Sequence, residues 1–208
     1  MASDTITLAI TGASGVQYGV RLLQCLLQKQ QTVHLMVSHA AQVVAATETE
    51  LRIPSQPEAV RDYFLSLFGA RQEQLNVYSR EQWMAPIASG SAISRAMVIC
   101  PCSSSTLAAI SMGLSNNLIE RAADVTLKEK QQLIVVTRET PLSQIHLHNM
   151  LTLSQAGAMI LPASPGFYHQ PKKIEDLVDF VVARVLDQLG IAQDLVEPWA
   201  NEKGHDKD

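Results

Sequence analysis

The sequence is poor in cysteine, in charge of either sign and in long apolar runs. Its 208 residues include only three cysteines, an odd number that does not fit a disulfide scaffold and that suits a reducing cytosol. The 16 basic residues form no cluster, and 20 acidic residues leave a net charge of −4, which argues against nucleic acid as the main partner. No run approaches the roughly 18 apolar residues of a membrane span, and the first residues lack the pattern of a secretion signal. We therefore expect a cytoplasmic protein.

Two common nucleotide-binding signatures are also missing. Gly12 and Gly15 lack the G-x-G-x-x-G spacing of dinucleotide sites, and Ser38 stands where such sites carry an acidic residue after the second strand. No Gly-Lys-Ser/Thr follows the turn, which excludes an ATP-binding P-loop. His146 and His148 fall on different faces of a predicted helix, so we expect no metal site there.

What the chain does contain is a regular alternation of short apolar runs with helical patterns. This alternation is typical of an α/β fold, a doubly wound parallel sheet between two layers of helices. The composition is uniform, so we treat residues 1–208 as a single domain whose tail, about 190–208, packs on a neighbouring subunit. We expect strands at 6–10, 33–37, 96–100, 133–137 and 158–161, and helices at about 16–27, 39–47, 57–68, 107 onward, 117–130, 143–156 and 174–189.

Two local predictions accompany this assignment. Residues 70–95 are expected to be irregular, and so long an insert within a compact domain is often functional. Pro101 is expected to end the third strand, because proline has no N–H for the ladder.

The first strand leads into the turn Thr11-Gly12-Ala13-Ser14-Gly15 and then into a helix. The first N–H groups of a helix have no partner within it, and the helix dipole has its positive end there. A phosphate is the usual ligand of such a terminus. The Ser14 hydroxyl adds a further donor, so the turn predicts a phosphate site.

Polar residues follow the predicted strands at their carboxyl ends, where ligands bind in doubly wound sheets. A hydroxyl-rich, weakly charged edge suits a mononucleotide with a polyol chain, and FMN has one phosphate and a ribityl chain. The run Ser103-Ser104-Ser105-Thr106 could donate to the phosphate and ribityl oxygens, or it could serve only as the cap of the helix that follows. The polar strand-end residues are Ser14, Ser38, Ser103, Ser104, Ser105, Thr106, Arg138, Glu139 and Tyr168.

Several short segments, taken together, are similar to a known family. They resemble the flavin prenyltransferases of the UbiX type, the partners of UbiD-type decarboxylases, and the resemblance runs from about residue 6 to 199. It implies a flavodoxin-like fold, in agreement with the pattern of strands and helices. The segments are Thr11–Gly15, Ala46–Thr49, Ala88–Ser91, Cys100–Ser103, Arg121–Val125, Leu127–Glu129, Arg138–Pro141 and Pro165–His169.

The resemblance implies a metal-independent transfer of a dimethylallyl group from dimethylallyl phosphate to N5 and C6 of reduced FMN. The product, prenylated FMN, would serve a UbiD-type decarboxylase, usually in ubiquinone biosynthesis. The family assembles as a homododecamer. The sequence is consistent with metal-independent transfer, because it lacks the Asp-Asp-x-x-Asp pattern that holds magnesium diphosphate.

The resemblance also assigns roles to residues. Glu139 would protonate the leaving phosphate and later accept the C6 proton, and the acid role needs a raised pKa. Arg121 and residues 89–91 would come from a neighbouring subunit, and Trp199 would wall the isoprene or form a subunit contact. The catalytic candidates are Glu139, Glu48 and Ser14; the FMN-binding ones are Gly12, Ala13, Ser14, Ser38, Ser103, Ser104, Ser105, Thr106 and Arg138; the substrate-binding ones are Ser89, Gly90, Ser91, Arg121, Lys128, Glu139, Tyr168, Arg184 and Trp199.

Two alternatives remain open at this point. One is a flavin-dependent decarboxylase of the same superfamily, although its signature loops are not evident. The other is a non-catalytic FMN carrier for the decarboxylase, which would have no need of Lys128, Glu139, Tyr168 and Arg184 together.

Overall fold

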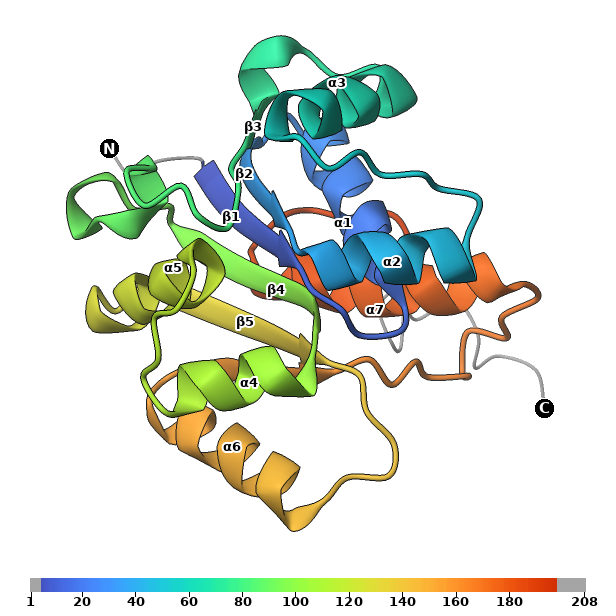
Figure 1. Ribbon diagram of the computed structural model, residues 1–208. Helices are drawn as coiled ribbons and strands as arrows, with labels where there is room; N and C mark the ends of the chain where they lie inside the picture. The colour runs from blue at the N-terminus through green and yellow to red at the C-terminus, as the bar shows by residue number, and fades with distance from the viewer. Residues whose placement is uncertain (1–4, 198–208) are drawn as a thin grey trace. The chain divides into compact units, whose positions relative to one another are not determined.

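The computed structural model describes residues 5–197, and within them six strands form one parallel sheet (Figure 1). The strand order is β3-β2-β1-β4-β5-β6, and all neighbours run parallel. This confirms the predicted α/β fold with a doubly wound parallel sheet. The strands are β1 (Thr5–Ile10), β2 (Thr32–Val37), β3 (Leu75–Val77), β4 (Ala96–Cys102), β5 (Gln132–Thr137) and β6 (Met159–Pro162).

The described chain divides into two compact units, with the boundary after Ala163. The first unit holds the sheet with helices α1–α6, and the second holds α7. No helix within residues 5–197 is both long enough and apolar enough to cross a membrane. The helices are α1 (Val16–Gln28), α2 (His39–Glu48), α3 (Pro57–Phe68), α4 (Ser104–Ser111), α5 (Leu118–Lys128), α6 (Gln144–Gln155) and α7 (Ile174–Gln188), with 3-10 turns η1 (Gln72–Gln74), η2 (Pro86–Ala88) and η3 (Gly90–Ala92).

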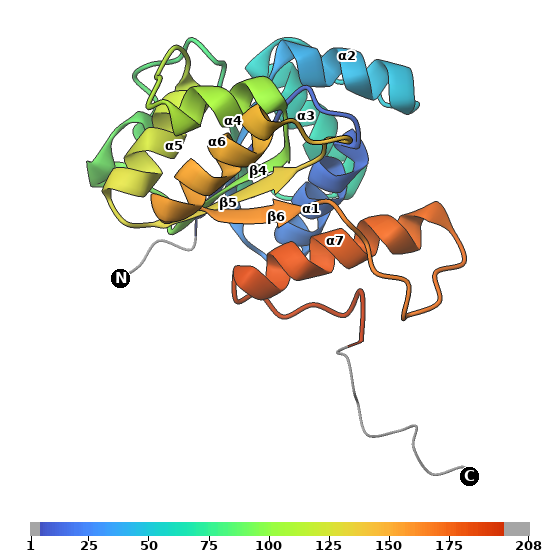
Figure 2. The ribbon, with the colours of Figure 1, turned by 90° about the horizontal axis from the view of Figure 1, so that it is seen from below.

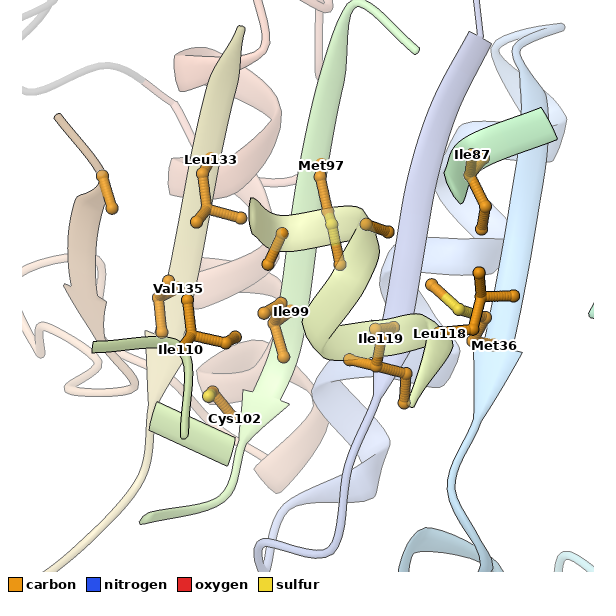
Figure 3. Close-up of a cluster of buried hydrophobic side chains, with 14 of the residues drawn as sticks. Met36, Ile87, Met97, Ile99, Cys102, Ile110, Leu118, Ile119, Leu133 and Val135 are labelled. Atoms are coloured by element: carbon orange, nitrogen blue, oxygen red, sulfur yellow. The ribbon is translucent and has the colours of Figure 1, made fainter. Parts of the chain in front are cut away.

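In the first unit, helices cover both faces of the sheet. Met97 and Ile99 of β4 pack in a buried cluster with side chains of α4, α5 and α6 (Figure 3). Val98, between them, points to the opposite face, because successive side chains of a strand alternate. On that face α1 lies against β1, β2 and β4 (Figure 2). Both faces of the central strands are therefore apolar, which is why these strands read as unbroken hydrophobic runs.

Capping residues begin the helices that follow the strands. Ser38 and Ser103 precede α2 and α4, and the side chain of each accepts the backbone N–H of the third residue of its helix. Asn117 caps α5 in the same way, with bonds from the N–H groups of Ile119 and Glu120. Helix α4 therefore starts at Ser104, three residues earlier than expected from the apolar pattern alone.

Two of the sequence predictions are wrong. Residues 70–95 are not wholly irregular, because the three-residue strand β3 pairs with β2 at the edge of the sheet. Pro101 does not end its strand, since β4 continues to Cys102. The register of β4 against β5 shifts between Ile99 and Cys102, and this irregularity accommodates a residue without an N–H.

Candidate functional site

The carboxyl ends of β1, β4 and β5 lie side by side, and Thr11 ties the loops after β1 and β4 together. Its N–H and its hydroxyl both donate to the carbonyl of Pro101, at 3.2 and 2.8 Å. The Thr11 hydroxyl oxygen also accepts the N–H of Ser103, at 2.7 Å. Thr11 is buried, so these bonds fix the position of the β1–α1 turn against the start of α4.

The β1–α1 turn was expected to offer its backbone N–H groups to a phosphate, but one of them, the N–H of Gly15, already has a partner. Gly15 has a positive φ of 91°, and its N–H donates to Oε2 of Glu48 at 2.8 Å. A carboxylate is stable at this position because the N-terminus of α1 carries the positive end of the helix dipole. A Cβ on Gly12 would lie 2.4 Å from Cβ of Ala40, so the turn packs tightly against the first turn of α2. Glu48, at the end of α2, reaches back to this turn.

Hydroxyl groups surround the first turns of α2 and α4. Ser38 Oγ accepts the N–H of Ala41 at 3.1 Å, and Ser103 Oγ accepts the N–H of Thr106 at 3.3 Å. Ser103 Oγ also lies 3.1 Å from Ser105 Oγ and 3.0 Å from Thr106 Oγ1. The Ser/Thr run is thus a helix cap, and the helix terminus that it caps lies at the carboxyl edge of the sheet. Three helix N-termini lie at this edge: that of α1 already holds the Glu48 carboxylate, and those of α2 and α4 remain to bind a further anion.

Glu139 and Arg138 follow β5 at the same edge. The Ser104 hydroxyl donates to Oε2 of Glu139 at 2.8 Å, and the N–H of Thr140 donates to Oε1 at 3.2 Å. These hydrogen bonds, with help from the nearby Arg138 guanidinium, lower the pKa of Glu139 below its ordinary value. Arg138 Nε donates to the carbonyl of Ser14 at 3.2 Å. The structure therefore brings Ser14, Ser104, Arg138 and Glu139 together.

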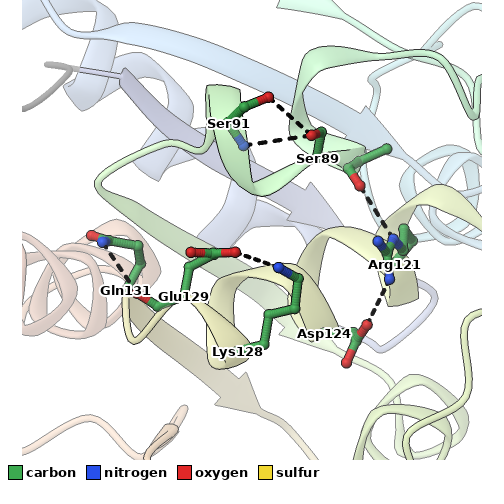
Figure 4. A network of polar contacts seen from close by, with 8 residues as sticks. Ser89, Ser91, Arg121, Asp124, Lys128, Glu129 and Gln131 are labelled. Carbon is green, nitrogen blue, oxygen red and sulfur yellow. Dashed lines mark hydrogen bonds and ion pairs between the residues drawn. The ribbon is translucent and has the colours of Figure 1, made fainter.

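A second group of predicted residues lies along α5 and the η2–η3 turns, and we call it the α5 patch (Figure 4). Arg121 Nε donates to the carbonyl of Ala88 at 3.2 Å, and its Nη1 lies 2.9 Å from Oδ2 of Asp124. Lys128 pairs with Glu129. The patch consists of Ser89, Gly90, Ser91, Arg121, Asp124, Lys128 and Glu129.

The α5 patch and the carboxyl-edge residues do not form one site within a single chain. Lys128 stands just before β5 and Glu139 just after it. A six-residue strand spans roughly 17 Å, so these two residues lie at opposite edges of the sheet. Ser89, Gly90 and Ser91 precede β4 and lie near Glu129, at the same edge as Lys128.

The second unit contains the remaining predicted residues that the structure describes. Tyr168 and Arg184 line a cavity of about 240 Å³, together with Phe180 and Asp187. The Tyr168 ring meets the Phe180 ring edge-on at 5.6 Å, and Arg184 Nη1 lies 2.8 Å from Oδ2 of Asp187. A guanidinium and a phenol that share a cavity can bind a phosphate or a carboxylate. Trp199 lies outside the described residues.

Residues 5–197 hold no group of three or more His, Cys, Asp or Glu side chains that could bind a metal ion. Among the predicted site residues, the cationic ones are Arg121, Lys128, Arg138 and Arg184.

Known proteins resemble this chain over almost its whole length. A family model described as Flavoprotein matches residues 1–186. The flavin prenyltransferase UbiX of Pseudomonas aeruginosa PAO1 is 57% identical over 199 residues, covering 96% of this chain and 95% of that protein.

Two solved structures share the fold and a substantial part of the sequence. One is AnUbiX (PadA1) in complex with FMN and dimethylallyl pyrophosphate, with 37% identity and a TM-score of 0.84 over 98% of this chain and all of that one. The other is a dodecameric FMN-dependent UbiX-like decarboxylase from Escherichia coli O157:H7, with 38% identity and a TM-score of 0.82 over 95% of this chain and 100% of that one.

Proposed function

The chain belongs to the flavin prenyltransferases of the UbiX type, and from this premise we propose that it transfers a dimethylallyl group from dimethylallyl phosphate to reduced FMN. The observation that carries the proposal is the 57% identity to the Pseudomonas aeruginosa enzyme across 96% of the chain. The AnUbiX complex with FMN and a dimethylallyl diphosphate supports the same two ligand classes. The product would be prenylated FMN.

The residues of the carboxyl edge fit a flavin mononucleotide. Its phosphate is a dianion, and the N-termini of α2 and α4 offer N–H groups and positive dipole ends to it. Ser38, Ser103 and Thr106 offer hydroxyls to the phosphate and the ribityl chain, and the closely packed Gly12 leaves no side chain in the way. Reduced FMN, when bound, supplies the nucleophilic N5 and the C6 position that take the dimethylallyl group.

Glu139 is the proposed proton carrier. Because hydrogen bonds from Ser104 and Thr140 lower its pKa, it is a carboxylate at neutral pH and is ready to accept the proton from C6. A substrate phosphate nearby would raise the pKa of Glu139 by like-charge repulsion, and this would prepare the carboxyl group to protonate the leaving phosphate. Glu48, at the other side of the β1–α1 turn, is proposed to handle a proton near the flavin ring, and Ser14 to assist there.

We propose that the complete site is built from more than one copy of the chain. In this arrangement Arg121, Lys128 and the loop of Ser89, Gly90 and Ser91 come from a neighbour and stabilise the charge on the leaving phosphate. Two observations support it: the opposite-edge positions of Lys128 and Glu139, and the dodecameric Escherichia coli relative. A homododecamer is the proposed assembly.

Tyr168 and Arg184 are proposed to bind the phosphate of the isoprenoid substrate, and Trp199 to wall the isoprene or to contact a neighbour. Arg121, Lys128 and Arg184 each already have a carboxylate partner, Asp124, Glu129 and Asp187 respectively.

The product is proposed to pass to a UbiD-type decarboxylase, with ubiquinone biosynthesis as the setting, and the place of action is proposed to be the cytoplasm. The cysteines support a reducing compartment, because Cys25, Cys100 and Cys102 are buried thiols that are not joined in disulfides. Burial raises the pKa of Cys102 to about 12, so its thiol is not reactive at neutral pH.

One assay tests the activity against both alternatives. The protein is mixed without oxygen with reduced FMN and dimethylallyl phosphate, and the flavin is then weighed by mass spectrometry. A flavin heavier by one isoprene unit supports the prenyltransferase. Bound FMN of unchanged mass would favour a carrier. In a parallel reaction that contains a peptidyl or pantothenoyl cysteine, release of carbon dioxide would favour the decarboxylase.

A further inference from the structure

Arg184 belongs to a chain of hydrogen bonds within the second unit. Its Nη1 lies 2.8 Å from Oδ2 of Asp187, one turn further along α7. The other carboxylate oxygen of Asp187, Oδ1, accepts from Nε2 of Gln193 at 3.4 Å. One carboxylate thus links the cavity-lining arginine to the segment that follows α7.

Gln193 is itself held by the backbone beyond it. Its Oε1 accepts the N–H groups of Leu195 and Val196, at 2.8 and 3.1 Å, and its Nε2 donates to the carbonyl of Val196 at 3.1 Å. Since the amide oxygen is occupied by two N–H donors, the amide nitrogen is the end that faces Asp187. The orientation of the carboxylate is therefore set by the fold of residues 193–196.

The Arg184–Asp187 pair contributes little to folding. The side chains are 51% and 36% exposed, and exposed ion pairs of this kind add between nothing and about 1 kcal/mol. An unpaired arginine on a helix surface samples many rotamers, and a ligand that binds it must overcome this freedom. Asp187 engages Nη1 and leaves the other N–H groups of the guanidinium for a second anion.

We propose that Asp187, oriented by Gln193, is a positioning residue that fixes the Arg184 guanidinium for the phosphate of the isoprenoid substrate. This inference rests on the proposed function, in which Arg184 binds that phosphate. It adds a residue without a direct substrate contact, and it identifies the carboxylate as a geometric support rather than a catalytic group.

The test compares two substitutions of Asp187 in the full-length protein. Asp187→Ala removes the support altogether and should raise the KM for dimethylallyl phosphate about three- to fivefold, the upper part of the range of an exposed charge pair, while kcat changes less than about twofold. Asp187→Asn keeps an oxygen that accepts from Nη1 and should leave KM within about twofold of the parent. FMN affinity, measured by titration, should be unchanged in both variants.

A double-mutant cycle with Arg184→Ala separates positioning from general damage. If Asp187 acts through Arg184, adding Asp187→Ala to Arg184→Ala should not raise KM further. If Asp187 had a merely structural role, Asp187→Ala would raise KM both in the parental protein and in the Arg184→Ala variant. Glu175→Gln, an exposed acid on the same helix, is the matched control and should leave KM and kcat at parental values.

The outcomes distinguish this inference from the function on which it rests. An unchanged KM in Asp187→Ala, beside a raised KM in Arg184→Ala, would overturn the positioning role and leave the function standing. Equal rises in KM for the alanine and asparagine variants would also overturn it, because they would point to charge instead of geometry. No rise in KM for Arg184→Ala would remove the proposed phosphate-binding role of Arg184. If Asp187→Ala fails to fold, the test uses Asp187→Asn and Gln193→Ala instead. A normal KM in Asp187→Asn together with a raised KM in Gln193→Ala would support the proposal. A normal KM in both variants would overturn it.

Discussion

Strand β5 runs between Lys128, the last residue of α5, and Glu139, which follows the carboxyl end of the strand. The strand separates them by roughly 17 Å, which is too far for both side chains to touch one dimethylallyl phosphate. Each also has a partner at its own edge of the sheet, Glu129 for Lys128 and Ser104 for Glu139. If both residues serve one reaction, they must come from different copies of the chain.

Subunit mixing tests this directly. We expect Lys128→Ala and Glu139→Gln each to lose most of the transfer activity. When equal amounts of the two variants are dissociated and reassembled together, about a quarter of the sites should contain both native residues, and about a quarter of the parental activity should return. The readout is the yield of prenylated FMN by mass spectrometry.

The control for mixing is a pair that cannot rebuild a site. Glu139→Gln reassembled with the double variant Lys128→Ala/Glu139→Gln has no native Glu139 in any copy, so no activity should return. Absence of recovery in the first mixture, with mixed oligomers demonstrated by native mass spectrometry, would show that both residues act within one chain.

A second prediction concerns Glu139 itself. Glu139→Gln removes the proton-accepting carboxylate but preserves the shape of the side chain, so FMN should still bind with parental affinity. Transfer should slow by about 10²–10⁴-fold, the range for loss of a general acid or base. Single-turnover formation of prenylated FMN is the measurement. Parental turnover in this variant would remove Glu139 from the proton-transfer role.

A third prediction follows from the Ser104–Glu139 hydrogen bond, the largest cause of the lowered pKa of Glu139. Ser104→Ala should raise the pKa of Glu139 toward its ordinary value. A base with a higher pKa is protonated at higher pH, so the acid limb of the kcat/KM profile should move to higher pH. Ser154→Ala, at an exposed position of α6, should leave that limb in place. An unmoved limb in Ser104→Ala would mean that another group governs it.

Strands and helices could be predicted from the sequence where the residues of a single segment form a recognisable pattern. The strands around Leu8, Val98 and Val135 are apolar on both faces, and helix α2 has a serine cap, so neighbouring residues sufficed to place them. Strand β3 escaped prediction because three residues are too few for a periodic pattern. The extension of β4 through Pro101 depends on an irregular pairing with β5, which is a property of two segments and not of one.

For the candidate site, the sequence indicated residue types but not the contacts between them. Motif resemblance and strand-end positions identified Ser14, Arg138 and Glu139, and the structure brings them to one edge. The bond from Gly15 N–H to Glu48 joins residues 33 positions apart, and no local pattern announces it. Asp187 and Gln193 were missed as well. Their only sequence signal was the i,i+3 spacing of Arg184 and Asp187, which is common on helix surfaces.

The last prediction concerns Thr11, whose hydroxyl joins the two loops that flank the proposed flavin site. Thr11→Val keeps the shape of the side chain but removes the two hydroxyl bonds, to the Pro101 carbonyl and from the Ser103 N–H, while the backbone bond from the residue 11 N–H to that carbonyl remains. Leaving the Ser103 N–H without its acceptor, and the Pro101 carbonyl with one donor fewer, should lower the free energy of unfolding by about 1–3 kcal/mol and weaken FMN binding, because the start of α4 is held less firmly to the β1–α1 turn. Urea denaturation and FMN titration measure the two effects.

Thr47→Val is the control for Thr11→Val. The hydroxyl of Thr47 is exposed on α2 and donates to the carbonyl of Val43, so its loss should change stability by less than about 0.5 kcal/mol. Equal effects of the two substitutions on stability and on FMN affinity would show that the Thr11 bridge has no special part in holding the site together.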